Sequence, residues 1–150
     1  MEIIVEGVNT SSAHRLMNHK GKCQHLHGHT YQYKFTFYGQ KTDEDSGMLV
    51  DFADLKEIVS KVLDPLDHAT ILNIDDKTLI EFLRKEENRL IVLGNEPTAE
   101  EMAKYLFKAV DIQLDNVLTL EMNHIVLVQV QVWETPKFSA TYGLDDQAEV

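Results

Sequence analysis

The sequence predicts one domain that combines β-strands with α-helices. In two long runs, 28–39 and 124–134, apolar or aromatic residues recur at every second position, which is the side-chain period of a strand. Two other segments, 52–62 and 98–109, place apolar residues at the three- and four-residue spacing of a helix face. We find no repeat and no Pro/Gly/Ser-rich linker, so these elements are expected to share one core.

The first half of the chain is expected to contain two strands and a helix. A strand is predicted at about 2–9, and a loop from about 15 to 26 leads into the long strand at about 28–39. The glycine-rich polar segment 39–47 is typical of a turn. Asp51 can then cap a helix. The inner stripe of that helix consists of apolar residues at helical spacing, namely Phe52, Leu55, Ile58, Val59 and Val62.

The middle of the chain alternates again between loop, helix and strand. Pro65 disfavours helical backbone in the residue before it, so residues 66–68 are expected in a loop or short turn. The highly charged segment 76–88 predicts a second helix. The apolar segment 89–93 predicts a short strand.

The last third is expected to contain a helix and a hairpin of strands. Residues 98–101, TAEE, match a capping box that opens a third helix, whose inner face is Met102, Tyr105, Leu106 and Ala109. The strand at 124–134 is expected to point one set of side chains to a single face, namely Val126, Val128, Val130, Val132 and Glu134. A final strand at 138–142 precedes a flexible tail at about 144–150.

Composition predicts a single compact domain spanning residues 1–150. Hydrophobic residues make up 43% of the chain, which is enough for a real core. The one cysteine, Cys23, excludes an internal disulfide and agrees with a reducing compartment. No segment has the features of a signal peptide or a membrane span, so we expect a cytoplasmic protein. The net charge of −11 disfavours nucleic acid and anionic membranes as partners.

The charge is unevenly distributed along the chain. Residues 7–42 contain no Asp or Glu, yet they contain five Lys or Arg residues and five of the seven histidines. Sheet residues tend to avoid acidic side chains, which could produce this pattern alone. The functional interpretation is that the segment attracts an anionic substrate.

Histidines in this segment have the spacing of a metal site. His27 and His29 form an H-x-H pair at the start of the alternating run, so both imidazoles can point to one strand face. His14, in SSAHRL, offers a third imidazole. A catalytic zinc site uses three protein ligands and keeps one position open, and neutral imidazole suits zinc. Cys23 is then available for chemistry, whereas His25 is expected to face solvent.

Six sequence blocks, in order, resemble the 6-pyruvoyl-tetrahydropterin synthase family. They are SAHRL, KCxxLHGHTY, GMLVDFADLK, LDH at 66–68, PTAE at 97–100 and VWET at 132–135. An H-x-H pair alone is weak evidence, whereas an ordered series over nearly the whole chain is specific. The four-residue step from Cys23 to His27 and the VDFADL block resemble the branch of 6-carboxy-5,6,7,8-tetrahydropterin synthases, which act in queuosine (7-deazaguanine) biosynthesis.

The resemblance implies an α+β architecture called the tunnelling fold. In this fold an antiparallel sheet has helices packed on one face, and subunits oligomerise into a β-barrel. The resemblance also implies a homohexamer, a dimer of trimers, with active sites at the subunit interfaces.

Roles for individual residues follow from the same resemblance. The residues that match the zinc (Zn2+) ligands of the family are His14, His27 and His29. Cys23 matches the proton acceptor, and Asp67 with His68 matches the pair that activates it from a neighbouring subunit. Glu134 matches the carboxylate that anchors the pterin ring and can take part in the proton relay.

Thr98 and Glu100 match secondary pterin contacts of the family. The chain departs from the family pattern at the next residue, because Glu101 stands where the family commonly has Asn, so the hydrogen bonds of that Asn are lost or replaced. The segment 73–96 is longer than in compact bacterial members. We expect it to add a helix at the rim of the site.

The resemblance implies a zinc-dependent lyase that converts 7,8-dihydroneopterin triphosphate to 6-carboxy-5,6,7,8-tetrahydropterin with loss of triphosphate and acetaldehyde. Two alternatives stay open. One is a 6-pyruvoyl-tetrahydropterin synthase of tetrahydrobiopterin-type biosynthesis, and the other is a non-catalytic, zinc-stabilised pterin-binding protein. Cys23, Asp67 and His68 together argue against the second alternative, because binding alone requires neither a base nor a relay.

Overall fold

The computed structural model describes residues 1–40, 43–117 and 125–149. Within these ranges six strands form one sheet in the order β4-β3-β1-β2-β5-β6. The strands are β1 (Glu2–His14), β2 (His27–Gly39), β3 (Thr70–Asn73), β4 (Leu90–Leu93), β5 (Ile125–Thr135) and β6 (Phe138–Gly143). The helices are α1 (Phe52–Leu63), α2 (Lys77–Lys85) and α3 (Ala99–Val117), with short 3-10 helices at Lys22–Gln24 and Leu144–Glu149. In the described part of the chain, every helix is too short or too polar to cross a bilayer.

The sheet is mixed, so the expectation of an antiparallel sheet is wrong for one end of it. β1, β2, β5 and β6 pair antiparallel, whereas β3 pairs parallel with both β1 and β4. The cause is connectivity, because helices α1 and α2 precede and follow β3 and return the chain in the same direction. β3 itself escaped prediction, since four residues are too few to show a strand period.

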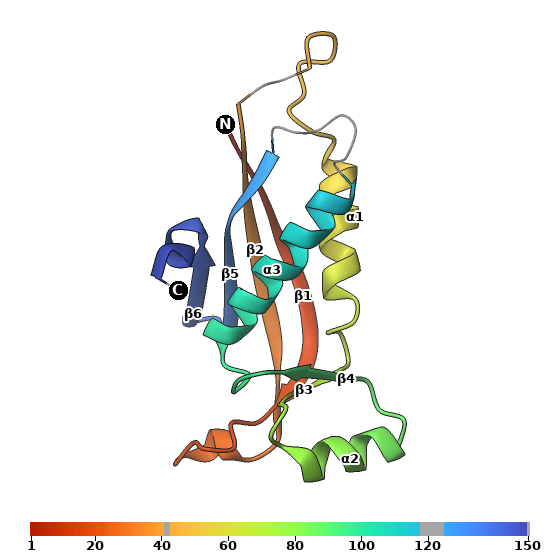
Figure 1. Ribbon diagram of the computed structural model, residues 1–150, viewed down its shortest axis with the longest axis vertical. Coiled ribbons are helices and arrows are strands. Elements are labelled where there is room, and N and C mark those ends of the chain that lie inside the picture. Colours follow the sequence, from red (N-terminus) through yellow and green to blue (C-terminus); the bar gives the residue numbers. More distant parts are fainter. Residues whose placement is uncertain (41–42, 118–124, 150) are drawn as a thin grey trace.

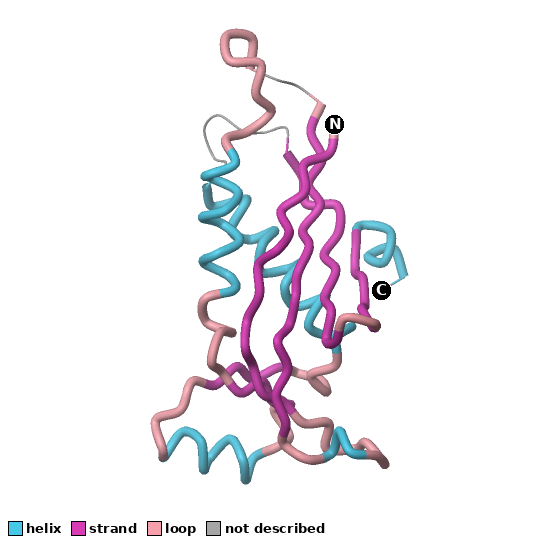
Figure 2. The backbone as a smooth tube through the Cα atoms, turned by 180° about the vertical axis from the view of Figure 1, so that it is seen from behind, coloured by secondary structure: helices cyan, strands magenta, loops and turns pink. Residues whose placement is uncertain are grey.

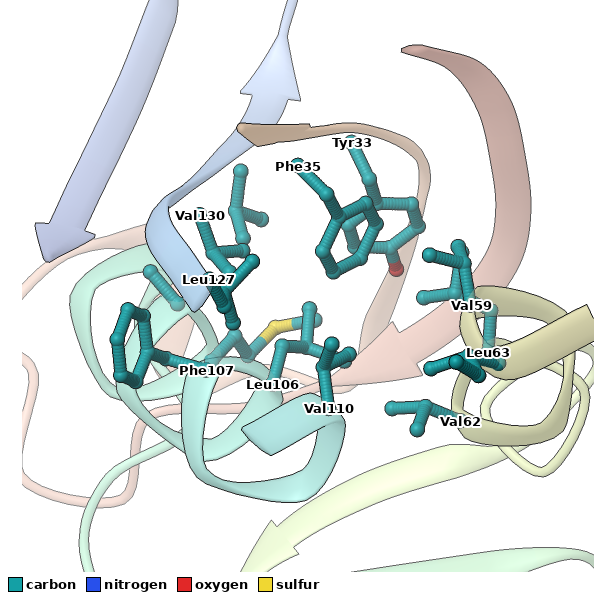
Figure 3. Packing of buried hydrophobic residues seen from close by; sticks show 14 of the residues in the cluster. Tyr33, Phe35, Val59, Val62, Leu63, Leu106, Phe107, Val110, Leu127 and Val130 are labelled. Carbon is teal, nitrogen blue, oxygen red and sulfur yellow. The ribbon is translucent and has the colours of Figure 1, made fainter. Parts of the chain in front are cut away.

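Helices α1 and α3 cover one face of the long strands (Figure 1). The view from behind shows the opposite face of these strands without a helix over it (Figure 2). On β2 the covered face carries four buried aromatic residues, Tyr31, Tyr33, Phe35 and Phe37. They pack against apolar side chains of both helices, including Val59, Leu63, Leu106 and Val110 (Figure 3). This core fixes the position of β2 and of the histidines at its start.

Helix α2 lies on the other side of the sheet from α1 and α3. Successive strand residues point to opposite faces, and on β3 Ile71 belongs to the main core whereas Leu72 packs against Ile80 and Leu83 of α2. The expectation that all helices pack on one face is therefore wrong for α2. The additional helix expected in 73–96 is present.

Three irregularities interrupt the described strand pairings, and two of them, in β1 and in β5 where it faces β2, decide which side chains reach the core face; the third lies between Trp133 and Thr135, where β5 faces β6. In β1 the extra residue is Gly7, whose φ of 78° suits glycine, and the pairing changes between Glu6 and Val8. The bulge brings the even-numbered residues from Val8 to His14 onto the face that carries Val5. Strand β1 also continues to His14, five residues past the predicted end, because it pairs with β2 along its whole length.

The second bulge, in β5, corrects the predicted face of that strand. Thr36 pairs with Gln129 but Phe37 pairs with Leu127, which leaves Val128 as the extra residue. Consequently Val126 is exposed and Val128 only half-buried, while the core face continues from Leu127 to Val130 and Val132. Residue 124, the predicted start of this strand, lies outside the described residues.

The helix ends follow the predicted signals, but the predicted inner faces need two corrections. On α1, Phe52 was expected on the inner stripe and is exposed, because it is the first residue of the helix; the other correction is on α3. The Asp51 carboxylate accepts a hydrogen bond from the Ala53 backbone N–H at 2.8 Å and caps α1. On α3 the fully buried face is Met102, Ala103, Leu106, Phe107, Val110 and Leu114. Tyr105 and Ala109, predicted on that face, are half-buried at its edge.

Candidate metal centre and active site

Strands β1 and β2 bring the three predicted histidines together. His14 pairs with His27 and Ser12 pairs with His29, and the Gly7 bulge puts His14 on the face of the H-x-H pair. The ring centroids form a near-equilateral triangle, with separations of 4.6 Å for His14–His27, 5.1 Å for His14–His29 and 4.9 Å for His27–His29. One ligand nitrogen from each ring lies within 4.8 Å of the others. The three histidines are close enough to bind one metal ion.

Backbone carbonyls set the tautomers of two of these rings. A carbonyl oxygen can only accept, so Nδ1 of His14 donates to the Pro97 carbonyl at 2.8 Å, and Nδ1 of His27 donates to the His25 carbonyl at 2.7 Å. The Nε2 atom of each ring then carries a free lone pair. Such outer hydrogen bonds orient metal-binding imidazoles in proteins.

The spacing of two of the remaining nitrogens matches that of ligands on a tetrahedral zinc ion. Nε2 of His14 and Nε2 of His27 are 3.2 Å apart, and neither has a proton to donate to the other. Two nitrogens bound tetrahedrally to zinc lie roughly 3.3–3.4 Å apart, given Zn–N distances of about 2.0–2.1 Å. Nε2 of His29 is buried without a hydrogen-bond partner. Burial also lowers the pKa of His14 and of His29, which favours the neutral form that binds metals.

Glu134 lies beside this histidine cluster. It follows Val130 and Val132 on the core face of β5, and its Oε1 atom is 3.4 Å from Nε2 of His29. Its side chain is half-buried. The carboxylate therefore lies next to the H-x-H pair, on the neighbouring strand.

Cys23 lies in the loop that connects β1 to β2, in the 3-10 helix Lys22–Gln24. The Leu16 backbone N–H donates to the Cys23 carbonyl at 2.9 Å. The carboxylate of Glu96 accepts hydrogen bonds from the backbone N–H groups of Met17 and Asn18, at 3.0 and 3.2 Å, and so holds the start of the loop. Cys23 is half-buried. Burial raises the pKa of the Tyr31 phenol, followed by smaller contributions from Glu134, Tyr33 and, least, Cys23.

Asp67 and His68 lie on the opposite face of the sheet from the histidine cluster. His68 has 77% of its side chain exposed and lines a surface hollow with Ser11 and Thr30. Ser11 and Thr30 alternate with Ser12 and His29, so their side chains point away from the metal centre. Within one chain the structure does not bring His68 to Cys23.

The Asp67–His68 pair is itself well ordered by hydrogen bonds. Nδ1 of His68 and Oδ2 of Asp67 are 2.8 Å apart, and the Ser11 backbone N–H donates to Oδ1 of Asp67 at 2.8 Å. Both hydrogen bonds lower the pKa of Asp67, and the one from Ser11 has the larger effect. His68 adopts a positive φ of 57°, a conformation fixed here by the bond from its N–H to the Ser11 carbonyl.

The PTAE block starts α3 next to the metal centre. Thr98 is half-buried and its hydroxyl accepts from the Glu101 backbone N–H at 3.4 Å, which is half of the predicted capping box. The Glu101 carboxylate instead accepts from Nδ2 of Asn95 at 3.0 Å. Glu101 thus links the helix to the preceding loop, and Glu100 is exposed.

The basic segment contributes less free charge than its composition suggests. Arg15 forms a two-pronged ion pair with the buried carboxylate of Asp76, with both N–O distances at 2.5 Å. This pair ties the end of β1 to the start of α2 and removes Arg15 from the candidates for anion binding. Lys41, also counted in that segment, lies outside the described residues.

Comparison with known proteins identifies the family. A sequence model of the family described as 6-pyruvoyl tetrahydropterin synthase matches residues 3–145. The chain belongs to this family. It is 36% identical over 136 residues to the 6-carboxy-5,6,7,8-tetrahydropterin synthase of Haemophilus influenzae, covering 87% of this chain and 90% of that protein.

Two further matches come from Caenorhabditis elegans. A putative 6-pyruvoyl tetrahydrobiopterin synthase is 35% identical over 144 residues, covering 88% of this chain and 87% of the relative. The solved structure of the 6-pyruvoyl tetrahydropterin synthase superimposes with a TM-score of 0.65 at 31% identity, covering 95% of this chain and 96% of the other. This protein is thus a member of a family of tetrahydropterin synthases, with their α+β fold.

Sequence reasoning missed a buried polar chain beside the metal centre of this family member. The Ser12 hydroxyl donates to the Leu66 carbonyl at 2.8 Å, which obliges Thr10 to donate to Ser12 at 3.1 Å and Tyr33 to donate to Thr10 at 2.6 Å. Burial raises the pKa of Tyr33 to about 12, so it remains a donor. The only available signal was polar residues at alternate positions of β1. The carbonyls of Pro97 and His25 gave no signal, because every residue has one.

Proposed function

We propose that this protein is a zinc-dependent lyase that converts 7,8-dihydroneopterin triphosphate to 6-carboxy-5,6,7,8-tetrahydropterin, releasing triphosphate and acetaldehyde, in queuosine (7-deazaguanine) biosynthesis. The observation that carries the proposal is the histidine cluster, His14, His27 and His29, with Glu134 beside it, in a chain of the tetrahydropterin synthase family. The relative from Haemophilus influenzae, named as the carboxy enzyme, supports the choice of product.

Cys23 is the proposed general base. The reaction must remove a proton from a carbon of the substrate side chain that bears a hydroxyl. A partly exposed thiolate near a metal ion is suited to that task. We assign Asp67 and His68 of a neighbouring subunit as the pair that activates it. Their position on the far face of their own sheet supports a site shared between chains, and hence the homohexamer with interfacial active sites.

The other groups bind and orient the substrate. His14, His27 and His29 would hold zinc, which supplies Lewis acidity that stabilises negative charge developing on the substrate side chain. Glu134 accepts hydrogen bonds from the aminopyrimidine edge of the pterin and fixes the orientation of the ring. Thr98 and Glu100, at the start of α3, add secondary contacts. We expect the enzyme to act in the cytoplasm, where Cys23 stays a free thiol.

A second candidate function is 6-pyruvoyl-tetrahydropterin synthase. It is favoured by the Caenorhabditis elegans relative, whose 35% identity is close to the 36% of the carboxy enzyme. Both reactions need the same metal centre and base. They differ in whether the substrate side chain keeps its three carbons, and the residues described above serve both.

The product formed from 7,8-dihydroneopterin triphosphate separates these candidates. We would incubate the zinc-loaded protein with this substrate and identify the products by mass spectrometry, with Cys23→Ala as the matched control. The proposal predicts a carboxytetrahydropterin together with acetaldehyde. A pyruvoyl product without acetaldehyde would establish the second candidate, and pterin binding without any turnover would establish a non-catalytic binding protein.

A further inference from the structure

Tyr31 is a buried phenol without a hydrogen-bond partner. Its side chain is 0% exposed, and its hydroxyl has no acceptor. Tyr33, two residues along the same strand face, is equally buried, but its hydroxyl donates to Thr10 at 2.6 Å. An unpaired hydroxyl in a dry interior costs free energy, so native proteins rarely keep one without a use.

The environment of Tyr31 points to the metal centre. Its ring packs edge-on against His14 and His29, with centroids 5.8 and 5.6 Å away. On the neighbouring strand, Val132 pairs with Tyr33 and Trp133 pairs with Gln32. The β2–β5 pairing ends there, and Glu134 is the next residue of β5. Its Oε1 atom is 3.4 Å from Nε2 of His29, the ring that packs against Tyr31, so the carboxylate and the phenol share a neighbour.

Glu134, in turn, lacks a hydrogen-bond donor. Among the described residues its carboxylate makes no hydrogen bond, and its nearest charged neighbour is Nε2 of His29 at 3.4 Å. When that nitrogen binds a metal it has no proton to offer. The unpaired donor beside the same histidine is the Tyr31 hydroxyl. Of the nearby charges, that of Glu134 contributes most to the raised pKa of Tyr31, after burial itself, which agrees with their proximity.

We propose that Tyr31 is a positioning residue, whose hydroxyl donates to the Glu134 carboxylate in the metal-loaded protein and holds it in place for the pterin ring. The proposal extends the role proposed for Glu134, and only its pterin-binding part rests on the proposed function. A hydrogen bond from a neutral O–H to a carboxylate is short and strong, and it uses one lone pair while leaving the others for the ligand. Tyr31 therefore restricts the rotation of a carboxylate that would otherwise be free to turn.

The neighbouring hydroxyls do not compete for this role. The donor sequence from Tyr33 through Thr10 and Ser12 ends on the Leu66 carbonyl, so each of these hydroxyl protons is already used. Tyr33 is consequently a matched control. It has the same chemistry and burial as Tyr31 on the same strand face, but a satisfied hydroxyl.

A double-mutant cycle tests the proposal in the zinc-loaded protein at fixed protein concentration. The four proteins are the unaltered chain, Tyr31→Phe, Glu134→Ala and the double variant, and the readout is denaturant unfolding. We expect Tyr31→Phe to lower the folding equilibrium constant about tenfold when Glu134 is present and less than twofold when it is absent. In protein stripped of metal, Nε2 of His29 can carry a proton and compete for the carboxylate, which is 3.4 Å away, so the effect of Tyr31→Phe should be smaller.

The affinity for unsubstituted pterin, followed by its fluorescence, provides the functional half of the test. Tyr31→Phe should weaken binding about tenfold with unchanged zinc content, and it should have no further effect in the Glu134→Ala background. Tyr33→Phe should lower stability and leave pterin affinity unchanged. Equal effects of Tyr31→Phe with and without Glu134 would overturn the positioning role while leaving the proposed function intact. Coupling between the two residues without any pterin binding would instead support the hydrogen bond and refute the proposed function.

Discussion

The separation of His68, on the face of the sheet away from the histidine cluster, from Cys23, in the β1–β2 loop, predicts complementation between two inactive variants. Cys23→Ala removes the proposed base, and His68→Ala removes the imidazole that activates it. Each homogeneous variant should be about 10²–10⁴-fold less active, which is the usual contribution of general acid–base catalysis. Because the structure does not bring the two groups together within a chain, a site shared between chains lets each variant supply the group that the other lacks.

The expected recovery follows from random assembly. In an equal mixture, half of the chains provide Cys23 and half provide His68, so about one quarter of the shared sites contain both groups. The mixture should therefore regain roughly a quarter of the activity of the unaltered protein, far above the residual activity of either variant.

The assay dissociates the two variants, mixes them, reassembles them and compares turnover with that of each variant treated alone. Mass spectrometry of intact oligomers confirms that the chains have mixed. Activity that stays at the level of the separate variants in proven mixed oligomers would refute the shared site. A strict monomer by light scattering, with full activity, would refute it as well.

Three further predictions concern single side chains. Cys23→Ala should keep its zinc and its pterin affinity but lose turnover, a transition-state effect of at least about 3 kcal/mol. Ser12→Ala removes the acceptor of the buried Thr10 hydroxyl, whereas the Leu66 carbonyl keeps its bond from the Ala69 N–H at 3.2 Å. It should cost about 1–3 kcal/mol, or roughly 2–4 °C in Tm per kcal/mol, by calorimetry; an unchanged Tm would contradict the buried chain. The hydrogen bond from the Ser11 N–H, and to a smaller extent that from His68, lowers the pKa of Asp67. The ionised Asp67 therefore stabilises the fold above the ordinary aspartate pKa, and this stabilisation is lost as pH falls through the lowered pKa. Denaturant unfolding at about pH 5 and pH 2 should therefore show the stability advantage over Asp67→Asn shrinking with acid, and a constant difference would refute the assignment.

The sequence predicted the parts of the site that depend on local period. An H-x-H pair at the start of an alternating strand must point both imidazoles to one face, and the structure has His27 and His29 there. The Asp51 cap and the helix that follows it were likewise predicted from local sequence signals. His14 was identified from its residue type and its motif, since the predicted strand ended before it.

The bulges at Gly7 and Val128 could not be predicted, because a bulge arises from the pairing of two strands and not from one segment. The first puts His14 on the core face, and the second moves Val126 and Val128 off it. The parallel strand β3 (Thr70–Asn73) escaped for a similar reason, as it is stabilised by its neighbours rather than by its own pattern. The face to which His68 points likewise depends on the tertiary fold.

The most direct test of the metal centre is the zinc content of His27→Ala compared with that of His25→Ala. His25 is exposed and contributes only its backbone carbonyl, which alanine retains, so it is a matched control. Elemental analysis of each protein after dialysis against buffered zinc should find about one zinc per chain in the unaltered protein and in His25→Ala, and close to none in His27→Ala. Stoichiometric zinc in His27→Ala would contradict the assignment of His14, His27 and His29 as the metal ligands.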